Sequence, residues 1–251
     1  YKLNKKNSLL FYINFALITL KHLILSDAQM FFAEDVYTLP FVATIAKLKR
    51  GILIYNSREF YAFLGGLTNK KLLQKTIAAI EKFFIKKTNL VLTTGDMDSE
   101  FLEKFYNINR TCVIRNIPLK KTCEIKHDFR KELNIPESKT LLLYQGVLLK
   151  GRGLKLLIKS LTKLPDCVLI ILGEGVLRVE LEKLASELNV KNQVVFYGAI
   201  EQKELNKYTA GADIGFSLIE NISVSYYYAL PNKLFEYINA NIPIISSNLP
   251  Q

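Results

Sequence analysis

Strand-like and helix-like segments alternate along almost the whole of this 251-residue chain, and that alternation constrains its fold more than any other feature. Short apolar runs predict buried strands, and the segments between them carry apolar residues at helical spacing. Strands that alternate with helices form parallel sheets with covering helices. The predicted strands cover residues 29–33, 52–56, 89–93, 111–115, 140–145, 167–172, 193–197, 212–217 and 242–246. The predicted helices cover residues 8–26, 37–49, 70–87, 97–106, 152–163, 176–189, 201–210 and 231–240.

A looser stretch with two prolines and many charged residues separates two such series. We therefore expect an α/β protein with two Rossmann-like domains, 1–117 and 139–251, joined by a linker over 118–138. In such sheets ligands lie beyond the carboxyl ends of the strands, so the loops that follow strands are the informative ones. The chain begins at Tyr1 and stops at Gln251 just after a strand, so we interpret both domains as incomplete.

The positive charge of the chain lies mostly in its first half. The net charge is +11, and residues 1–120 carry 18 Lys and Arg against 9 Asp and Glu, compared with 16 against 14 in residues 121–251. The predicted helix 70–87 surrounds apolar residues with lysines, which suits either an anionic lipid surface or the solvated face of a core helix. Because no zinc finger, helix-turn-helix or aromatic RNA motif is present, we favour a membrane or lipid-linked partner over nucleic acid.

Cysteine and histidine usage predicts a reducing compartment and no histidine-based metal site. The three cysteines are odd in number and widely spaced, which argues against a disulfide framework and for the cytoplasm, with peripheral contact at the inner face of the plasma membrane to be considered. Neither histidine has acidic or cysteine neighbours at ligand spacing. Polar residues interrupt the apolar segment 8–25 before it reaches the length of a membrane span, so we interpret it as a buried helix.

The loop after the strand predicted at 140–145 suits a diphosphate. Gly146 and Gly151 have the spacing of a phosphate-binding loop, but Arg152-Gly153 stands where an NTPase has Lys-Ser or Lys-Thr, so we reject an NTPase. Glycine lets the backbone approach phosphate, and Arg152 offers a planar fork of donors, with Lys150 as a weaker candidate. The alternative is an ordinary strand-to-helix turn with a solvated arginine.

Residues 230–237, Leu-Pro-Asn-Lys-Leu-Phe-Glu-Tyr, predict a helix start that carries a cation and a carboxylate. Pro231 suits the first helical position, where the free N–H groups and the helix dipole attract anions. Lys233 adds a full charge there, and Glu236 can accept hydrogen bonds from a diol, which together indicate a nucleotide. A solvated Lys233–Glu236 ion pair is the alternative. We expect Leu234, Phe235 and Ile238 to turn inward and Asn232, Lys233 and Glu236 to share another face.

Other strand ends carry weaker candidates. Gly173-Glu174-Gly175 and Tyr197-Gly198 follow or end two strands of the second series, where a nucleotide contact or a simple turn explains the glycines equally well. In the first series, four charged residues follow two strands, and helix capping or surface charge is their alternative explanation. These residues are Glu34, Asp35, Arg58 and Glu59.

Taken together, these loops resemble the retaining, GT-B-fold glycosyltransferases of family four, also known as glycosyl transferases group 1. Residues 31–40 are similar to the family's AHDLYTLP segment, and 55–60 are similar to YDSHEL, with Glu34 and Arg58 where histidines are usual. Residues 113–118 are similar to the family's exit into the linker. The segments YQG…GRG at 144–153 and LPNKxFEY at 230–237 match one subgroup.

The resemblance implies two domains that face a cleft, the first for the acceptor and the second for a nucleoside-diphosphate sugar. Arg152 and Lys233 would bind the donor diphosphate and support catalysis, Glu236 would accept the ribose hydroxyls, and Gly173 and Gly175 would border the nucleotide. The family commonly carries another glutamate eight positions before Glu236, where this chain has Tyr228. The implied reaction is transfer with retention, without metal or cofactor, to a cell-envelope polysaccharide or lipid-linked acceptor.

The expected sites therefore lie in both domains, and other functions stay open. A degenerate nucleotide-sugar-binding or scaffold protein is one alternative, motivated by Tyr228, Glu34 and Arg58, and a GT-B-fold sugar-nucleotide epimerase is another. On the acceptor side we expect Glu34, Asp35, Arg58 and Glu59, with Glu59 also a candidate for catalysis. The expected donor-binding residues are Gly146, Lys150, Arg152, Gly173, Glu174, Gly175, Tyr197, Gly198, Tyr228, Asn232, Lys233 and Glu236.

Overall fold

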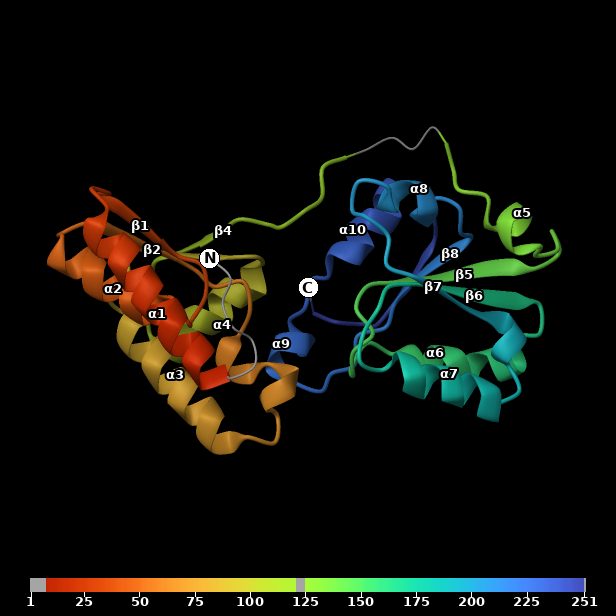
Figure 1. Ribbon diagram of the computed structural model, residues 1–251, viewed down its shortest axis with the longest axis horizontal. Helices are drawn as coiled ribbons and strands as arrows, with labels where there is room; N and C mark the ends of the chain where they lie inside the picture. Colours follow the sequence, from red (N-terminus) through yellow and green to blue (C-terminus); the bar gives the residue numbers. More distant parts are fainter. Residues whose placement is uncertain (1–7, 121–124, 251) are drawn as a thin grey trace. The chain divides into compact units, whose positions relative to one another are not determined.

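The computed structural model describes residues 8–120 and 125–250, which form two compact units (Figure 1). The first unit contains the chain up to Arg115 together with Ser223–Tyr228, and the second contains Asn116–Ile222 and Ala229–Pro250. Each unit has one sheet, and every strand pair in it is parallel. The prediction of an α/β fold with two parallel sheets is thus confirmed.

The first unit is built on a four-stranded sheet of order β1-β2-β3-β4. Its core lies between this sheet and the helices, and the strands alternate exposed and buried residues. The strands are β1 (Met30–Ala33), β2 (Ile52–Asn56), β3 (Leu90–Thr93) and β4 (Thr111–Val113). The helices are α1 (Ser8–Leu25), α2 (Leu39–Leu48), α3 (Lys71–Ile85), α4 (Asp96–Tyr106) and α9 (Val224–Tyr227), with 3₁₀ turns η1 (Tyr61–Phe63) and η2 (Gly65–Leu67).

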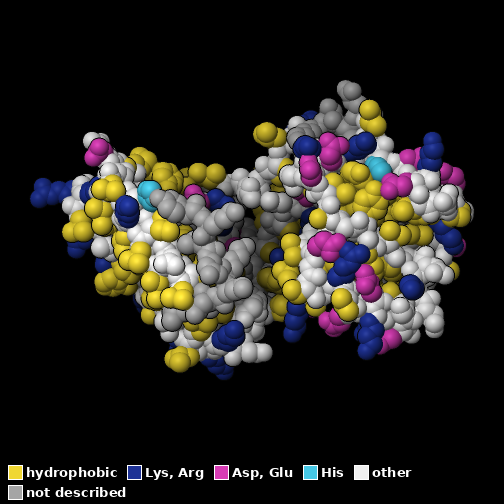
Figure 2. Space-filling model, in the orientation of Figure 1, with side chains coloured by type: hydrophobic (Ala, Val, Ile, Leu, Met, Phe, Trp, Pro, Cys, Tyr) yellow, Lys and Arg dark blue, Asp and Glu magenta, His cyan; other side chains and the backbone are white. Residues whose placement is uncertain are grey.

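The prediction that residues 8–25 form a buried helix is wrong in its burial. Helix α1 is present, but it packs mainly on α2, and among its described side chains Leu20 and Leu23 pack against the core. Large apolar side chains therefore lie on the surface of this unit, and Figure 2 shows hydrophobic side chains on its helices. No helix in the described part of the chain is long and apolar enough to span a bilayer. The exposed apolar residues of α1 are Leu10, Tyr12, Ile13, Leu17, Ile24 and Leu25.

The second unit is built on a five-stranded sheet of order β7-β6-β5-β8-β9. The strands are β5 (Thr140–Gln145), β6 (Cys167–Leu172), β7 (Val194–Gly198), β8 (Ile214–Ser217) and β9 (Ile244–Ser246). The helices are α5 (Phe129–Leu133), α6 (Leu154–Ser160), α7 (Arg178–Glu187), α8 (Leu205–Thr209) and α10 (Asn232–Asn239), with 3₁₀ turns η3 (Leu161–Lys163) and η4 (Lys191–Gln193).

Helices cover both faces of this second sheet, with α6 and α7 on one face and α8 and α10 on the other (Figure 1). Strand β5 alternates between the two cores: Leu142 and Tyr144 pack with α6 and α7, whereas Leu141 and Leu143 pack with α5 and α10. A strand buried on both faces reads as a continuous apolar run, which is why the sequence located it accurately. The stretch interpreted as a linker contains α5, whose Phe129 is buried in this second core.

Candidate active site

Three glycines meet at the carboxyl ends of β5, β6 and β7. The backbone N–H of Gly146 donates to the carbonyl of Leu172 at 2.9 Å, and that of Gly173 donates to the carbonyl of Gly198 at 2.7 Å. Gly173 has φ +151°, and a Cβ on it would lie 2.0 Å from the carbonyl oxygen of Gly146. Only glycine fits this close backbone approach. The three loops at Gly146, Gly173 and Gly198 therefore form one continuous strip of accessible backbone, which we call the glycine strip.

Lys233 extends from the first turn of α10 to this strip. Its Nζ lies 4.0 Å from the centroid of the Tyr144 ring and 3.5 Å from the position that a Cβ on Gly146 would take. Burial, followed by the charge of Arg152, lowers the pKa of Lys233 from 10.5 to about 7, and Glu236 partly offsets this. Arg152 and Lys233, the two predicted phosphate-binding cations, are therefore close enough to repel each other, and a bound anion would offset this repulsion.

The helix that carries Lys233 differs from the prediction in two details. Pro231 is extended, with ψ 135°, and caps the helix, which begins at Asn232. The fully buried residue is Tyr237, whereas Ile238 is 62% exposed. The hydroxyl of Tyr237 accepts from the backbone N–H of Gln145 at 3.3 Å and lies 3.1 Å from the carbonyl oxygen of Phe216. The residue that faces the core is thus one position earlier than predicted, and Lys233 and Glu236 still lie at the strand ends.

The carboxylate of Glu236 is held by two glutamines that the sequence analysis missed. The side-chain amide of Gln145 donates to its Oε2 at 2.5 Å, and the amide of Gln202 donates to its Oε1 at 3.1 Å. Gln145 is buried, and its amide oxygen accepts from the hydroxyl of Thr209 at 2.8 Å. The sequence signal for Gln145 was its place as a polar residue at the end of an otherwise mostly apolar strand.

Glu220, which the sequence analysis also missed, holds the backbone of the Gly151-Arg152-Gly153 turn. The carboxylate of Glu220 accepts from the backbone N–H of Gly153 at 3.1 Å, and the backbone N–H of Glu220 donates to the carbonyl of Gly151 at 3.0 Å. Gly153 has φ +69°, and a Cβ on it would lie 2.4 Å from the carbonyl oxygen of Leu218. These contacts fix the backbone that presents Arg152.

The remaining donor-side candidates are placed differently. The Glu174 side chain forms an ion pair with Arg178 on α7, and the Tyr197 hydroxyl donates to Glu132 at 3.0 Å within an aromatic cluster that includes Phe129. A Cβ on Gly175 would lie 2.5 Å from the carbonyl oxygen of Leu148. Lys150 and Asn232 are exposed.

Tyr228 belongs to the first unit. Its ring centroid lies 5.6 Å from those of Phe60 and Phe101, just after helix α9, which the sequence analysis did not predict. The position eight residues before Glu236 is thus occupied by a ring that packs in an aromatic cluster.

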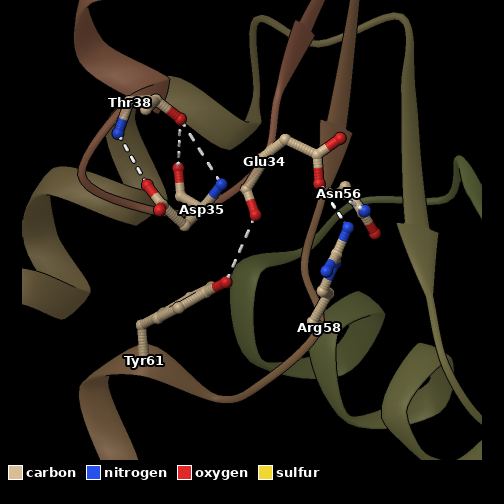
Figure 3. A network of polar contacts seen from close by, with 6 residues as sticks. All are labelled: Glu34, Asp35, Thr38, Asn56, Arg58 and Tyr61. Atoms are coloured by element: carbon tan, nitrogen blue, oxygen red, sulfur yellow. Dashed lines mark hydrogen bonds and ion pairs between the residues drawn. The ribbon is translucent and has the colours of Figure 1, made fainter. Parts of the chain in front are cut away.

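In the first unit, Glu34 and Arg58 form an ion pair at the carboxyl ends of β1 and β2 (Figure 3). The Glu34 carboxylate accepts from Arg58 at 2.7 Å and from the Asn56 amide at 3.0 Å. These two candidate acceptor-side residues therefore contact each other. Both side chains are more than half exposed, so the pair is available to a ligand.

Asp35 and Glu59 have more local surroundings. The Asp35 carboxylate accepts from the backbone N–H of Thr38 at 2.8 Å, which stabilises the turn before α2 (Figure 3). Burial and then the charges of Asp35 and Glu59 raise the pKa of Tyr61, whose hydroxyl donates to the carbonyl of Glu34 at 3.4 Å. Within the described residues, no group of three or more His, Cys, Asp or Glu side chains is arranged to hold a metal ion.

The fold is that of GT-B glycosyltransferases. Sucrose-phosphate synthase from Thermosynechococcus elongatus superposes with a TM-score of 0.73 at 16% identity, over 99% of this chain and 63% of that one. HepE from Anabaena, in complex with UDP-glucose, superposes with a TM-score of 0.68 at 14% identity, over 95% of this chain and 63% of that one. The family model "Glycosyl transferases group 1" matches residues 125–251, and the chain belongs to that family.

Curated relatives agree with this assignment. The uncharacterized glycosyltransferase MJ1059 of Methanocaldococcus jannaschii is 25% identical over 186 residues, which are 70% of this chain and 44% of the relative. The lipopolysaccharide core biosynthesis glycosyltransferase LpsE of Rhizobium meliloti is 27% identical over 118 residues, 47% of this chain and 32% of the relative. The chain thus spans less than half the length of the curated relatives that it matches.

Proposed function

We propose that this glycosyltransferase transfers a sugar, with retention and without an obligatory metal, from a nucleoside-diphosphate sugar to a cell-envelope glycan or lipid-linked acceptor. The observation that carries the proposal is the convergence of Arg152, Lys233 and Glu236 on the glycine strip of the second unit. Cations placed where a leaving diphosphate gains charge stabilise that charge more in the transition state than in the substrate. HepE binds UDP-glucose, which supports a sugar nucleotide as the donor class.

On the acceptor side we propose the Glu34–Arg58 pair, with Asp35 and Glu59 nearby in sequence. A carboxylate and a guanidinium held together offer both acceptors and donors to sugar hydroxyls. The role of LpsE in lipopolysaccharide core biosynthesis supports a cell-envelope acceptor. Exposed apolar residues of α3, such as Leu72 and Phe83, lie on the same helix as its lysines, which supports peripheral contact with anionic lipid at the cytoplasmic face.

The test is a thermal-shift and calorimetry panel of UDP-, GDP- and ADP-sugars on the whole chain. One class should raise Tm and bind, and Arg152→Ala should weaken that binding about ten- to a hundredfold, because it removes charge-assisted hydrogen bonds worth about 1.5–3 kcal/mol. Lys159→Ala, which removes one exposed cation from α6, is the matched control and should bind normally. Failure of every sugar nucleotide to bind would refute the proposal.

A nucleotide-sugar-binding protein without transferase activity is the second candidate function. The observation that favours it is Tyr228, whose ring packs against Phe60 and Phe101 at the position of a usual glutamate. Incubation of the chain with the bound sugar nucleotide separates the two: release of the nucleoside diphosphate supports transfer or hydrolysis, and tight binding without release supports the second candidate.

A further inference from the structure

The orientation of the Glu236 carboxylate is set by its neighbours. Each of its two oxygens accepts one hydrogen bond from a side-chain amide, at 2.5 Å from Gln145 and 3.1 Å from Gln202. The two glutamines come from different parts of the fold, because Gln145 ends β5 and Gln202 lies between β7 and α8. Held at both oxygens from two sides, the carboxylate loses the rotational freedom of an ordinary surface glutamate.

The Gln145 amide is itself fixed. A carboxylate can only accept hydrogen bonds, so the amide nitrogen and not the amide oxygen of Gln145 must face Glu236. The oxygen then accepts from the hydroxyl of Thr209, which is fully buried on α8. Gln145 is only 2% exposed, so solvent does not compete for its hydrogen bonds. Thr209, Gln145 and Glu236 form a chain of hydrogen bonds that ends at the edge of the glycine strip.

The arrangement leaves a defined capacity for a ligand. A carboxylate has about four lone-pair sites, two on each oxygen, and the two amides occupy one site on each. One acceptor site per oxygen stays available. Two acceptor sites on neighbouring oxygens match a pair of hydroxyls on adjacent carbon atoms, such as the 2′- and 3′-hydroxyls of a ribose.

We propose that Gln145 and Gln202 are positioning residues that orient the Glu236 carboxylate toward the 2′- and 3′-hydroxyls of the donor ribose, and that Gln145 sets the selectivity for ribonucleotides over deoxyribonucleotides. This inference rests on the proposed donor site. Gln145 carries most of the effect because it is buried, whereas Gln202 is exposed and contributes less.

The experiment is calorimetry of the whole chain with UDP, GDP and ADP, each beside its 2′-deoxy and 3′-deoxy analogues. Wild type should prefer the best-bound ribonucleotide over each analogue by about tenfold or more, the range expected for one hydrogen bond to a charged group. Gln145→Met keeps the side-chain length and removes the amide, and it should lower that preference to about two- to threefold by weakening ribonucleotide binding. Gln202→Ala should give a smaller loss in the same direction.

The ratio of the two affinities separates positioning from mere destabilisation, because a loosened fold weakens ribo- and deoxyribonucleotides alike. Gln193→Met is the matched control, since the Gln193 amide also makes two hydrogen bonds, to the carbonyls of Leu164 and Cys167, at η4. It should keep the wild-type preference. A folded Gln145→Met with the full preference, or equal losses for both nucleotide types, overturns the inference. Wild type that binds without discrimination also overturns it but leaves donor binding standing, whereas wild type that binds none of the nucleotides overturns the proposed function as well.

Discussion

Donor affinity should fall steeply as the pH rises above neutrality, because Lys233 loses its proton in the empty protein. Burial and the charge of Arg152 lower its pKa from 10.5 to about 7. A donor diphosphate placed against Nζ favours the protonated form and restores an ordinary lysine pKa. Binding above pH 7 therefore requires uptake of a proton.

The size of the effect follows from that pKa. With a pKa of about 7, roughly half of the empty protein is charged at Lys233 at pH 7 and about one molecule in a hundred at pH 9. If the bound form stays protonated, affinity falls about fiftyfold over this interval, or roughly 2.3 kcal/mol. The effect on folding has the opposite sign: the unfolded chain keeps its proton up to about pH 10.5, so the free energy of unfolding of the empty protein rises between about pH 7 and 10.5.

Calorimetry with a nucleoside-diphosphate sugar at several pH values checks this, since its esterified phosphates hold a constant charge across the range. In buffers of different ionisation enthalpy, the data should show uptake of close to one proton at pH 8. Lys233→Arg, which stays charged, and Lys233→Met, which cannot be charged, should both lack the dependence on pH. The reasoning is refuted if wild-type affinity is flat between pH 7 and 9, or if Lys233→Met keeps the slope.

Three further predictions concern packing and charge. Gly173→Ala forces a Cβ against the carbonyl oxygen of Gly146 and should cost at least about 1–3 kcal/mol of stability with loss of donor binding, whereas Gly66→Ala, with nothing within 4 Å, should be near neutral in chemical denaturation. Arg58→Gln should change the free energy of unfolding by less than about 1 kcal/mol, because its pair with Glu34 is exposed, and a larger drop would show a structural role. Glu81→Leu removes the carboxylate that accepts hydrogen bonds from the buried hydroxyls of Tyr55 and Tyr106, and it should lower the free energy of unfolding by about 2–6 kcal/mol in urea melts. Burial raises the pKa of Glu81 above 4.5, so the unfolded chain loses this proton at a lower pH than the folded protein does. The free energy of unfolding of the wild type should therefore fall as the pH rises above about 4.5, and Glu81→Gln should remove this dependence on pH.

The parts of the candidate site that rest on local chemistry were predictable. Glycines at strand ends and a cation at a helix start depend on a few neighbouring residues, and the structure brings Gly146, Gly173, Arg152 and Lys233 to one edge of one sheet. The tertiary contacts were not predictable. Gln145 and Glu236 are 91 positions apart, so no local pattern links them.

Tyr228 and helix α1 show the same limit. Tyr228 was assigned to the donor side because of its distance in sequence from Glu236, and only the structure shows that its ring packs with Phe60 and Phe101 in the first unit. Helix α1 has the composition of a buried helix, but burial depends on what lies beside a helix, and α1 packs mainly on α2. Composition states how apolar a segment is and not which of its faces finds a partner.

The two parallel sheets, the order of the strands and of the longer helices, and the loops that carry glycines and cations could be predicted from the sequence alone, because these depend on periodicity and turn chemistry over a few residues. Three features became visible only in the folded chain: Lys233 lies against Tyr144 with a lowered pKa, Glu34 pairs with Arg58, and two glutamines hold Glu236. Burial, charge proximity and hydrogen-bond partners arise between segments that folding brings together. They set the chemistry of a side chain whose identity alone does not.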